Sequence, residues 1–108
     1  MEIIKTNLEF GSNKTKREIS DIKRIILHNS GVTVLQSVEV IHNYHKNKCN
    51  YAGIGYHMYV RKDGTIYEGR PIEYIGAHTV SNNSDSIGIC FEGNFDEETM
   101  NETQLKAG

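Results

Sequence analysis

The 108-residue sequence predicts one α/β domain in which a mixed central β-sheet is flanked by helices. Two apolar runs, at 22–28 and 86–92, are typical of buried strands. An amphipathic stretch between them predicts a helix, and Asp63–Gly64 predicts a tight turn between two further strands. A strand, a helix and then several strands form a sheet that packs against a helix.

The first predicted elements are an edge strand at 2–4 and a long connection. Residues 7–20 are polar and rich in turn formers, so we expect a loop. Its basic cluster, Lys14–Arg17, is expected to be a solvated face, because the net charge is −2 and no aromatic residues interleave with it. Nucleic-acid binding is therefore not expected. The β-branched run at 22–28 predicts a central strand that ends on His28.

The predicted helix begins with Thr33 as its N-cap and runs to about His45 or Lys46. Its apolar stripe consists of Val34, Leu35, Val38 and Ile41. His42 and His45 are three residues apart and share a helix face. They are either a metal-binding pair or two side chains that flank the contact between helix and sheet, and we favour the second interpretation.

The elements that follow are, in chain order, a strand at 56–61, a return strand at 65–68, a polar loop at 72–85, a strand at 86–92 and the start of a helix after Thr99 or Asn101. Period-two alternation in the first of these strands places Tyr56, Met58 and Val60 on one face. The layer is unfinished, because one helix and an incipient one poorly cover both faces of an apolar sheet.

Cysteine usage and hydropathy narrow the class of protein further. Cys49 and Cys90 do not form a disulfide framework; Cys90, inside an apolar run, is expected to be a small buried hydrophobe. Cys49 lies in a polar loop and is either inert or reactive.

No apolar run is long enough to span a bilayer, so membrane insertion is not expected. Residues 1–5 lack the apolar core of an export signal, so we expect synthesis in the cytoplasm.

Four positions are candidates for a functional site. His28 ends a strand, where it either binds a metal such as zinc or bonds a carbonyl in the core. The Tyr56 hydroxyl either donates to a developing oxyanion or belongs to a ring that fills the sheet face. His78, in the bare loop 76–79, either meets a ligand or is an exposed loop histidine. Asn83 opens a polar stretch that either binds a peptide backbone or closes a turn.

Taken in order, five motifs carry a resemblance to a known family: Ile26–Ser30, Gly53–Val60, Asp63–Arg70, Gly76–Thr79 and Asn83–Phe95. They resemble the zinc-dependent N-acetylmuramoyl-L-alanine amidases, the family shared by phage endolysins and peptidoglycan recognition proteins. The resemblance implies the mixed-sheet fold of that family and hydrolysis of the amide between N-acetylmuramic acid and L-alanine. It also implies that residues 1–108 are the N-terminal portion of a single catalytic domain, truncated before the last helix.

The resemblance also implies roles for individual residues. His28 matches the first zinc ligand, Tyr56 matches the catalytic tyrosine, and His78 and Asn83 match the substrate groove. The family's other ligands are a His after the last strand and a Cys or Asp before a Pro-Gly pair. The only proline here is Pro71, so Zn²⁺ is the expected cofactor with its remaining protein ligands outside this chain. Peptidoglycan is the expected partner, and the cell wall the expected place of action.

The sequence is also compatible with two alternatives to a catalytic domain. A non-catalytic module would bind peptidoglycan through Tyr56, His78 and Asn83, and a fragment without its missing ligands would be inactive. In addition, self-association through the unfinished sheet and helix would let a neighbouring chain complete the site.

Overall fold

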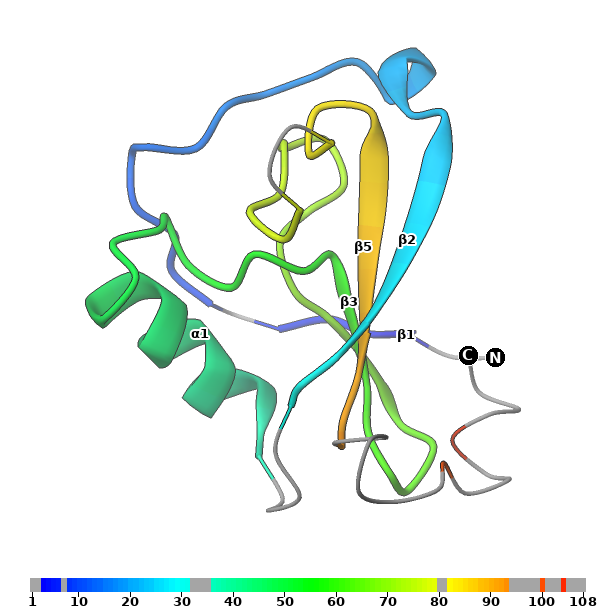
Figure 1. Ribbon diagram of the computed structural model, residues 1–108. Coiled ribbons are helices and arrows are strands. Elements are labelled where there is room, and N and C mark those ends of the chain that lie inside the picture. Colours follow the sequence, from blue (N-terminus) through cyan, green and yellow to red (C-terminus); the bar gives the residue numbers. More distant parts are fainter. Residues whose placement is uncertain are drawn as a thin grey trace.

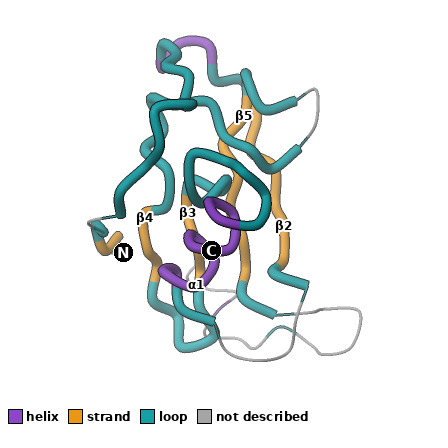
Figure 2. The backbone as a smooth tube through the Cα atoms, turned by 90° about the vertical axis from the view of Figure 1, so that its left-hand side faces the viewer, coloured by secondary structure: helices purple, strands orange, loops and turns teal. Residues whose placement is uncertain are grey.

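The computed structural model describes residues 3–6, 8–31, 36–79, 82–93, Met100 and Gln104. In this part of the chain, a five-stranded mixed sheet has the order β1-β4-β3-β5-β2, and helix α1 lies over one of its faces (Figures 1 and 2). The elements are β1 (Ile3–Ile4), a 3-10 turn η1 (Ile19–Asp21), β2 (Arg24–Asn29), α1 (Val38–Asn47), β3 (Met58–Val60), β4 (Ile66–Glu68) and β5 (Ser86–Phe91). The predicted fold class is confirmed.

Strand β5 lies between β3 and β2 and pairs in parallel with both. β3 pairs antiparallel with β4, and the edge strand β1 pairs in parallel with β4. The predicted turn between β3 and β4 is confirmed, because Gly64 has a φ of +90° and the Asp63 carboxylate accepts a 2.9 Å hydrogen bond from the Thr65 amide.

Each face of the sheet carries its own apolar cluster. On the α1 side, the buried side chains are Val38, Ile41, Ile54, Tyr59 and Cys90. The other cluster consists of Val60, Ile66 and Phe91, with Met58, Ile89 and Met100 packed against it. Cys90 is fully buried and free, as expected of a small core residue.

The strand that carries His28 is not central, contrary to the prediction. β2 is an edge strand of the described sheet, and Ile25 and Leu27 are 62% and 65% exposed. A run of β-branched and apolar residues favours a strand, but it does not determine how many neighbours that strand has. The apolar residues of β2 therefore fit pairing with β5 rather than burial on both faces.

The N-terminus of α1 also differs from the prediction. The helix begins at Val38 with Ser37 as N-cap, whose hydroxyl accepts a 3.3 Å hydrogen bond from the Val40 amide. Thr33 and Ser37 are both suitable caps, and the sequence pattern does not distinguish them. Thr33 and the following two residues lie outside the described residues.

The C-terminal helix predicted after Thr99 or Asn101 falls mostly outside the described residues, although Gln104 is helical. Within the described ranges, no helix is both long enough and apolar enough to cross a membrane.

Tyr56 does not continue the alternation of β3. The strand begins at Met58, and Tyr56 packs against the cluster that contains Tyr59 rather than on the face of Met58 and Val60. Residues before Met58 are irregular, so a period of two does not extend to them.

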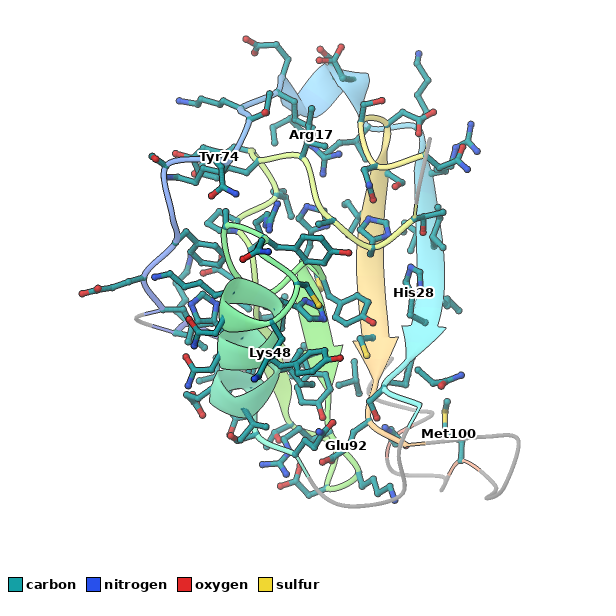
Figure 3. The ribbon with its side chains drawn as sticks, turned by 60° about the vertical axis from the view of Figure 1, so that its left-hand side comes forward. Arg17, His28, Lys48, Tyr74, Glu92 and Met100 are labelled. Carbon is teal, nitrogen blue, oxygen red and sulfur yellow. The ribbon has the colours of Figure 1, made fainter. Side chains whose placement is uncertain are left out.

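Arg17 is buried, contrary to the expected solvated cluster. It is 8% exposed, and its guanidinium donates to the carbonyls of Ser86 (2.7 Å), Asn83 (3.0 Å) and Ile72 (2.9 Å). These bonds tie the 71–72 segment to the start of β5. Arg17 and Glu92 lie toward opposite ends of the sheet (Figure 3).

Candidate functional site

Three of the predicted site residues meet beside the sheet. His28 comes from β2, Tyr56 from the segment before β3, and His78 from the loop after β4. The His28 Nε2 atom lies 3.0 Å from His78 Nδ1, and the His28 and Tyr56 rings are 5.3 Å apart between centroids. Figure 3 shows His28 on β2. The sequence motifs therefore converge in space although they are separated along the chain.

Asn83 holds the loop that carries His78. Its Oδ1 atom accepts hydrogen bonds from the backbone amides of His78 (2.9 Å) and Thr79 (2.8 Å). The predicted substrate-binding role of Asn83 stays a prediction, while these two bonds give it a positioning role. They orient the side chains of His78 and Thr79 toward His28, since Thr79 Oγ1 lies 3.1 Å from His28 Nε2.

Two glycines allow this close packing. A Cβ atom at Gly55 would overlap the Ala77 carbonyl, and one at Gly88 would lie 2.6 Å from the His78 ring. Both positions therefore require a residue without a side chain. The Gly53–Gly55 segment can approach the 76–79 loop this closely only because position 55 has no side chain.

A cavity of about 330 Å³ opens beside Tyr56. Its lining residues are Ser30, Gln36, Ile41, Tyr44, His45 and Tyr56. A cavity of this size, with apolar walls and a few polar groups, is typical of a small-ligand site.

His45 is a cavity residue for which the sequence favoured a role in the contact between helix and sheet over metal binding. His42 and His45 accept hydrogen bonds through Nδ1 from the consecutive amides of Ile54 and Gly55, at 3.1 and 2.9 Å. The favoured interpretation, contact between helix and sheet, fits both residues, but His45 also faces the cavity. The sequence features that could have indicated this cavity position are the spacing of three residues between His42 and His45 and the glycine-rich segment that follows the helix.

Burial keeps the site histidines neutral. It lowers the pKa of His28, and it lowers the pKa of His78 to about 4, with His28 and His57 acting in the same direction. Burial also raises the pKa of the Tyr56 hydroxyl, with Cys90 adding to the effect. At neutral pH the site thus presents uncharged imidazoles and a protonated phenol, which can donate a hydrogen bond.

His57 makes the stability of the metal-free chain depend on pH. Burial lowers its pKa to about 4, Arg17 and Arg70 act in the same direction, and the His78 ring faces it at 5.7 Å between centroids. An unfolded chain takes up this proton near pH 6.5 and the folded chain only near pH 4. Lowering the pH from 7 to 4 should therefore destabilise the fold, by at most about 3 kcal/mol from His57.

Urea unfolding at several pH values, with a chelator present, measures this effect. His57→Gln can still donate to the Tyr74 carbonyl, the 2.9 Å partner of His57 Nε2, but it does not titrate. We expect its stability to depend less on pH over this interval. An unchanged pH dependence in His57→Gln would show that other groups cause it.

The imidazole nitrogens beside Tyr56 are suitable for part of a zinc site. Neutral imidazole nitrogens are ligands that zinc prefers, and His28 presents one beside Tyr56. Within the described ranges, however, no three His, Cys, Asp or Glu side chains gather into a metal site. Cys90 is fully buried in the apolar cluster on the α1 side, and burial raises the pKa of its thiol to about 12.

Comparisons with known proteins agree with the fold. The profile of the N-acetylmuramoyl-L-alanine amidase family, Amidase_2, matches residues 18–108. Peptidoglycan-recognition protein SC2 of Drosophila melanogaster is 40% identical over 76 residues, which are 70% of this chain and 40% of that protein. The chain thus spans well under two thirds of this curated relative.

Solved structures share the fold over nearly the whole chain. The N-acetylmuramoyl-L-alanine amidase LysC from Clostridium intestinale has a TM-score of 0.88 at 33% identity, covering 99% of this chain and 69% of that one. The complex of peptidoglycan recognition proteins LCa and LCx bound to tracheal cytotoxin has a TM-score of 0.82 at 31% identity, covering 99% and 70%. The sequence profile, the sequence relatives and these structures together show that the chain belongs to the N-acetylmuramoyl-L-alanine amidase family.

Proposed function

We propose that this chain carries the substrate-facing wall of a zinc-dependent N-acetylmuramoyl-L-alanine amidase that acts on peptidoglycan in the cell wall. The carrying observation is the convergence of His28, Tyr56 and His78 next to a 330 Å³ cavity. Family membership and the relatives named above support peptidoglycan as the substrate class.

In this proposal each residue has a separate task. His28 would hold the zinc ion, which when bound supplies Lewis acidity and lowers the pKa of a bound water. Tyr56, whose hydroxyl stays protonated, donates a hydrogen bond to the oxygen that becomes negative as the amide is attacked. His45, whose Nδ1 accepts from the Gly55 amide, carries its proton on Nε2 and presents a second donor to the cavity.

Cleavage of a soluble muramoyl pentapeptide tests the proposal. The chain is incubated with Zn²⁺ and substrate, and the released peptide with a free L-alanine amino group is measured by mass spectrometry. Tyr56→Phe removes one hydroxyl and keeps the ring. We therefore expect the cleavage rate to fall by about 10²-fold or more, while the substrate affinity stays within about threefold of that of the unchanged chain.

The second candidate function is recognition without cleavage. It is favoured by the absence, in the described part of the chain, of a complete set of metal-binding side chains. Calorimetric titration of the muramoyl pentapeptide in excess chelator distinguishes the two functions. Binding that persists while no peptide is released with Zn²⁺ present would support recognition by this chain, and peptide release that needs Zn²⁺ would contradict recognition without cleavage.

A further inference from the structure

The guanidinium of Arg17 is held by a turn at residues 83–86. Its Nη1 atom donates to the carbonyls of Asn83 (3.0 Å), Ser84 (3.3 Å) and Ser86 (2.7 Å). Three carbonyls of one short turn therefore converge on a single nitrogen. Arg17 is only 8% exposed, so removal of its guanidinium would leave these carbonyls without a donor in a place that water reaches poorly.

The same turn holds the loop that carries His78. The Asn83 side chain accepts hydrogen bonds from the amides of His78 and Thr79, and the Asn83 carbonyl accepts from Arg17. Ser86 is placed in a similar way, because its carbonyl accepts from Arg17 and its hydroxyl lies 3.4 Å from His78 Nε2. Two residues of the turn thus join the buried guanidinium to the His78 loop.

A second route from Arg17 to His78 passes through His57. Arg17 Nη2 lies 3.3 Å from His57 Nε2, and the His57 and His78 rings are 5.7 Å apart between centroids. The His57 ring is itself fixed, because its Nδ1 accepts from the Gly88 amide at 3.0 Å and its Nε2 donates to the Tyr74 carbonyl at 2.9 Å. Arg17 therefore supports His78 from two directions.

The planar guanidinium of Arg17 bridges two segments of the chain. Its Nε atom donates to the Ile72 carbonyl at 2.9 Å while Nη1 reaches the 83–86 turn. A lysine ammonium keeps the charge, but it is a compact group that cannot serve both segments at once. Figure 3 places Arg17 toward one end of the sheet and His28 further along β2, so an effect of Arg17 on the site passes through these neighbours.

We propose that Arg17 is a positioning residue for substrate binding, whose guanidinium keeps the 83–86 turn in the shape that presents His78 and Thr79 to a muramoyl peptide. This inference rests on the proposed function, in which His78 lies beside the cavity that takes the substrate. It adds a residue that acts on the substrate only through its neighbours. Replacing Arg17 should therefore lower substrate affinity although every side chain of the site is still present.

Calorimetric titration of Arg17→Lys with the muramoyl pentapeptide, in excess chelator, tests the inference. We expect the affinity to be about tenfold lower than that of the unchanged chain. In the ligand-free variant, the amide resonances of His78 and Thr79 should also shift, because their acceptor Asn83 is no longer held in place. A purely structural Arg17 would lower the stability of the variant but leave the affinity of its folded fraction unchanged, and that result would overturn the inference.

Arg24→Lys is the matched control. Arg24 contacts the side chains of Asn82 (3.2 Å) and Asp85 (3.0 Å) in the same region, but its side chain is 52% exposed. Its affinity should therefore stay within about twofold of that of the unchanged chain. An equal loss in the two variants would overturn the inference. Absence of binding by the unchanged chain would also overturn it, whereas release of peptide by that chain with Zn²⁺ would leave the proposed function standing.

Hydrogen exchange in the unchanged chain decides the question if Arg17→Lys fails to fold. Because coupling between two sites is reciprocal, added muramoyl pentapeptide should slow the exchange of the Arg17 guanidinium protons together with that of the His78 amide. Protection that increases at His78 but not at Arg17 would overturn the inference.

Discussion

Replacing Arg70 by methionine is expected to lower the free energy of unfolding by about 3–5 kcal/mol. Arg70 is 4% exposed, and its guanidinium donates to the carbonyls of Ile75 (2.8 Å), Ile54 (3.1 Å) and Gly53 (3.2 Å). Methionine fills much of the same space but leaves these buried acceptors without their donor. Because Gly53 and Ile54 precede Tyr56, the substitution also releases one wall of the site.

Chemical denaturation measures this loss, and Arg24→Met is the matched control. Arg24 pairs with Asp85 at 3.0 Å, but its side chain is 52% exposed, so its removal should cost no more than about 1 kcal/mol. Equal losses in the two variants would contradict the role assigned to Arg70.

Glu92→Gln is expected to cost about 2–4 kcal/mol. The Glu92 carboxylate is 1% exposed and accepts hydrogen bonds from Arg61 Nη2 (3.0 Å), the Lys62 amide (2.9 Å) and the Gln36 amide (2.8 Å). Burial alone would raise the pKa of Glu92, but these bonds lower it overall. Glutamine has the same shape, yet it turns an NH₂ group toward donors that need an acceptor.

The effect of Glu92→Gln should reach α1 as well as the sheet. Gln36 precedes the N-cap Ser37, and its carbonyl accepts a 2.9 Å hydrogen bond from the Tyr59 hydroxyl. Thermal unfolding followed by circular dichroism gives the stability, and amide exchange at Gln36 reports on the helix start. Asp85→Asn, which alters the exposed pair, is the control; a loss as small as in that control would show that the Glu92 contacts contribute little.

The sequence pattern was sufficient where local chemistry determines the structure. The apolar run that forms β5 and the Asp63–Gly64 turn are determined by residues next to one another, so they were predictable. The grouping of His28, Tyr56 and His78 was also predictable, because each lies at the end of a strand or in a loop beside the sheet.

Features that depend on distant partners were not predictable. Arginine is rarely buried, so nothing in the sequence marked Arg17 and Arg70 as interior donors to backbone carbonyls. The edge position of β2 depends on which strands pair, and the role of His45 depends on the path of the Gly53–Gly55 segment. The contact of His78 with Ser86 joins two residues that come together only in the fold.

The edge position of β2 has a consequence for how the site responds to a ligand. In the sheet formed by the described residues, β2 pairs with β5 alone, and Leu27, which is 65% exposed, adds little packing next to His28. Strands with one neighbour and little buried apolar surface open locally at a low free-energy cost. We therefore expect a ligand that contacts both His28 and the 76–79 loop to hold this strand in place, so that hydrogen-exchange protection of the β2 amides increases when the ligand is added.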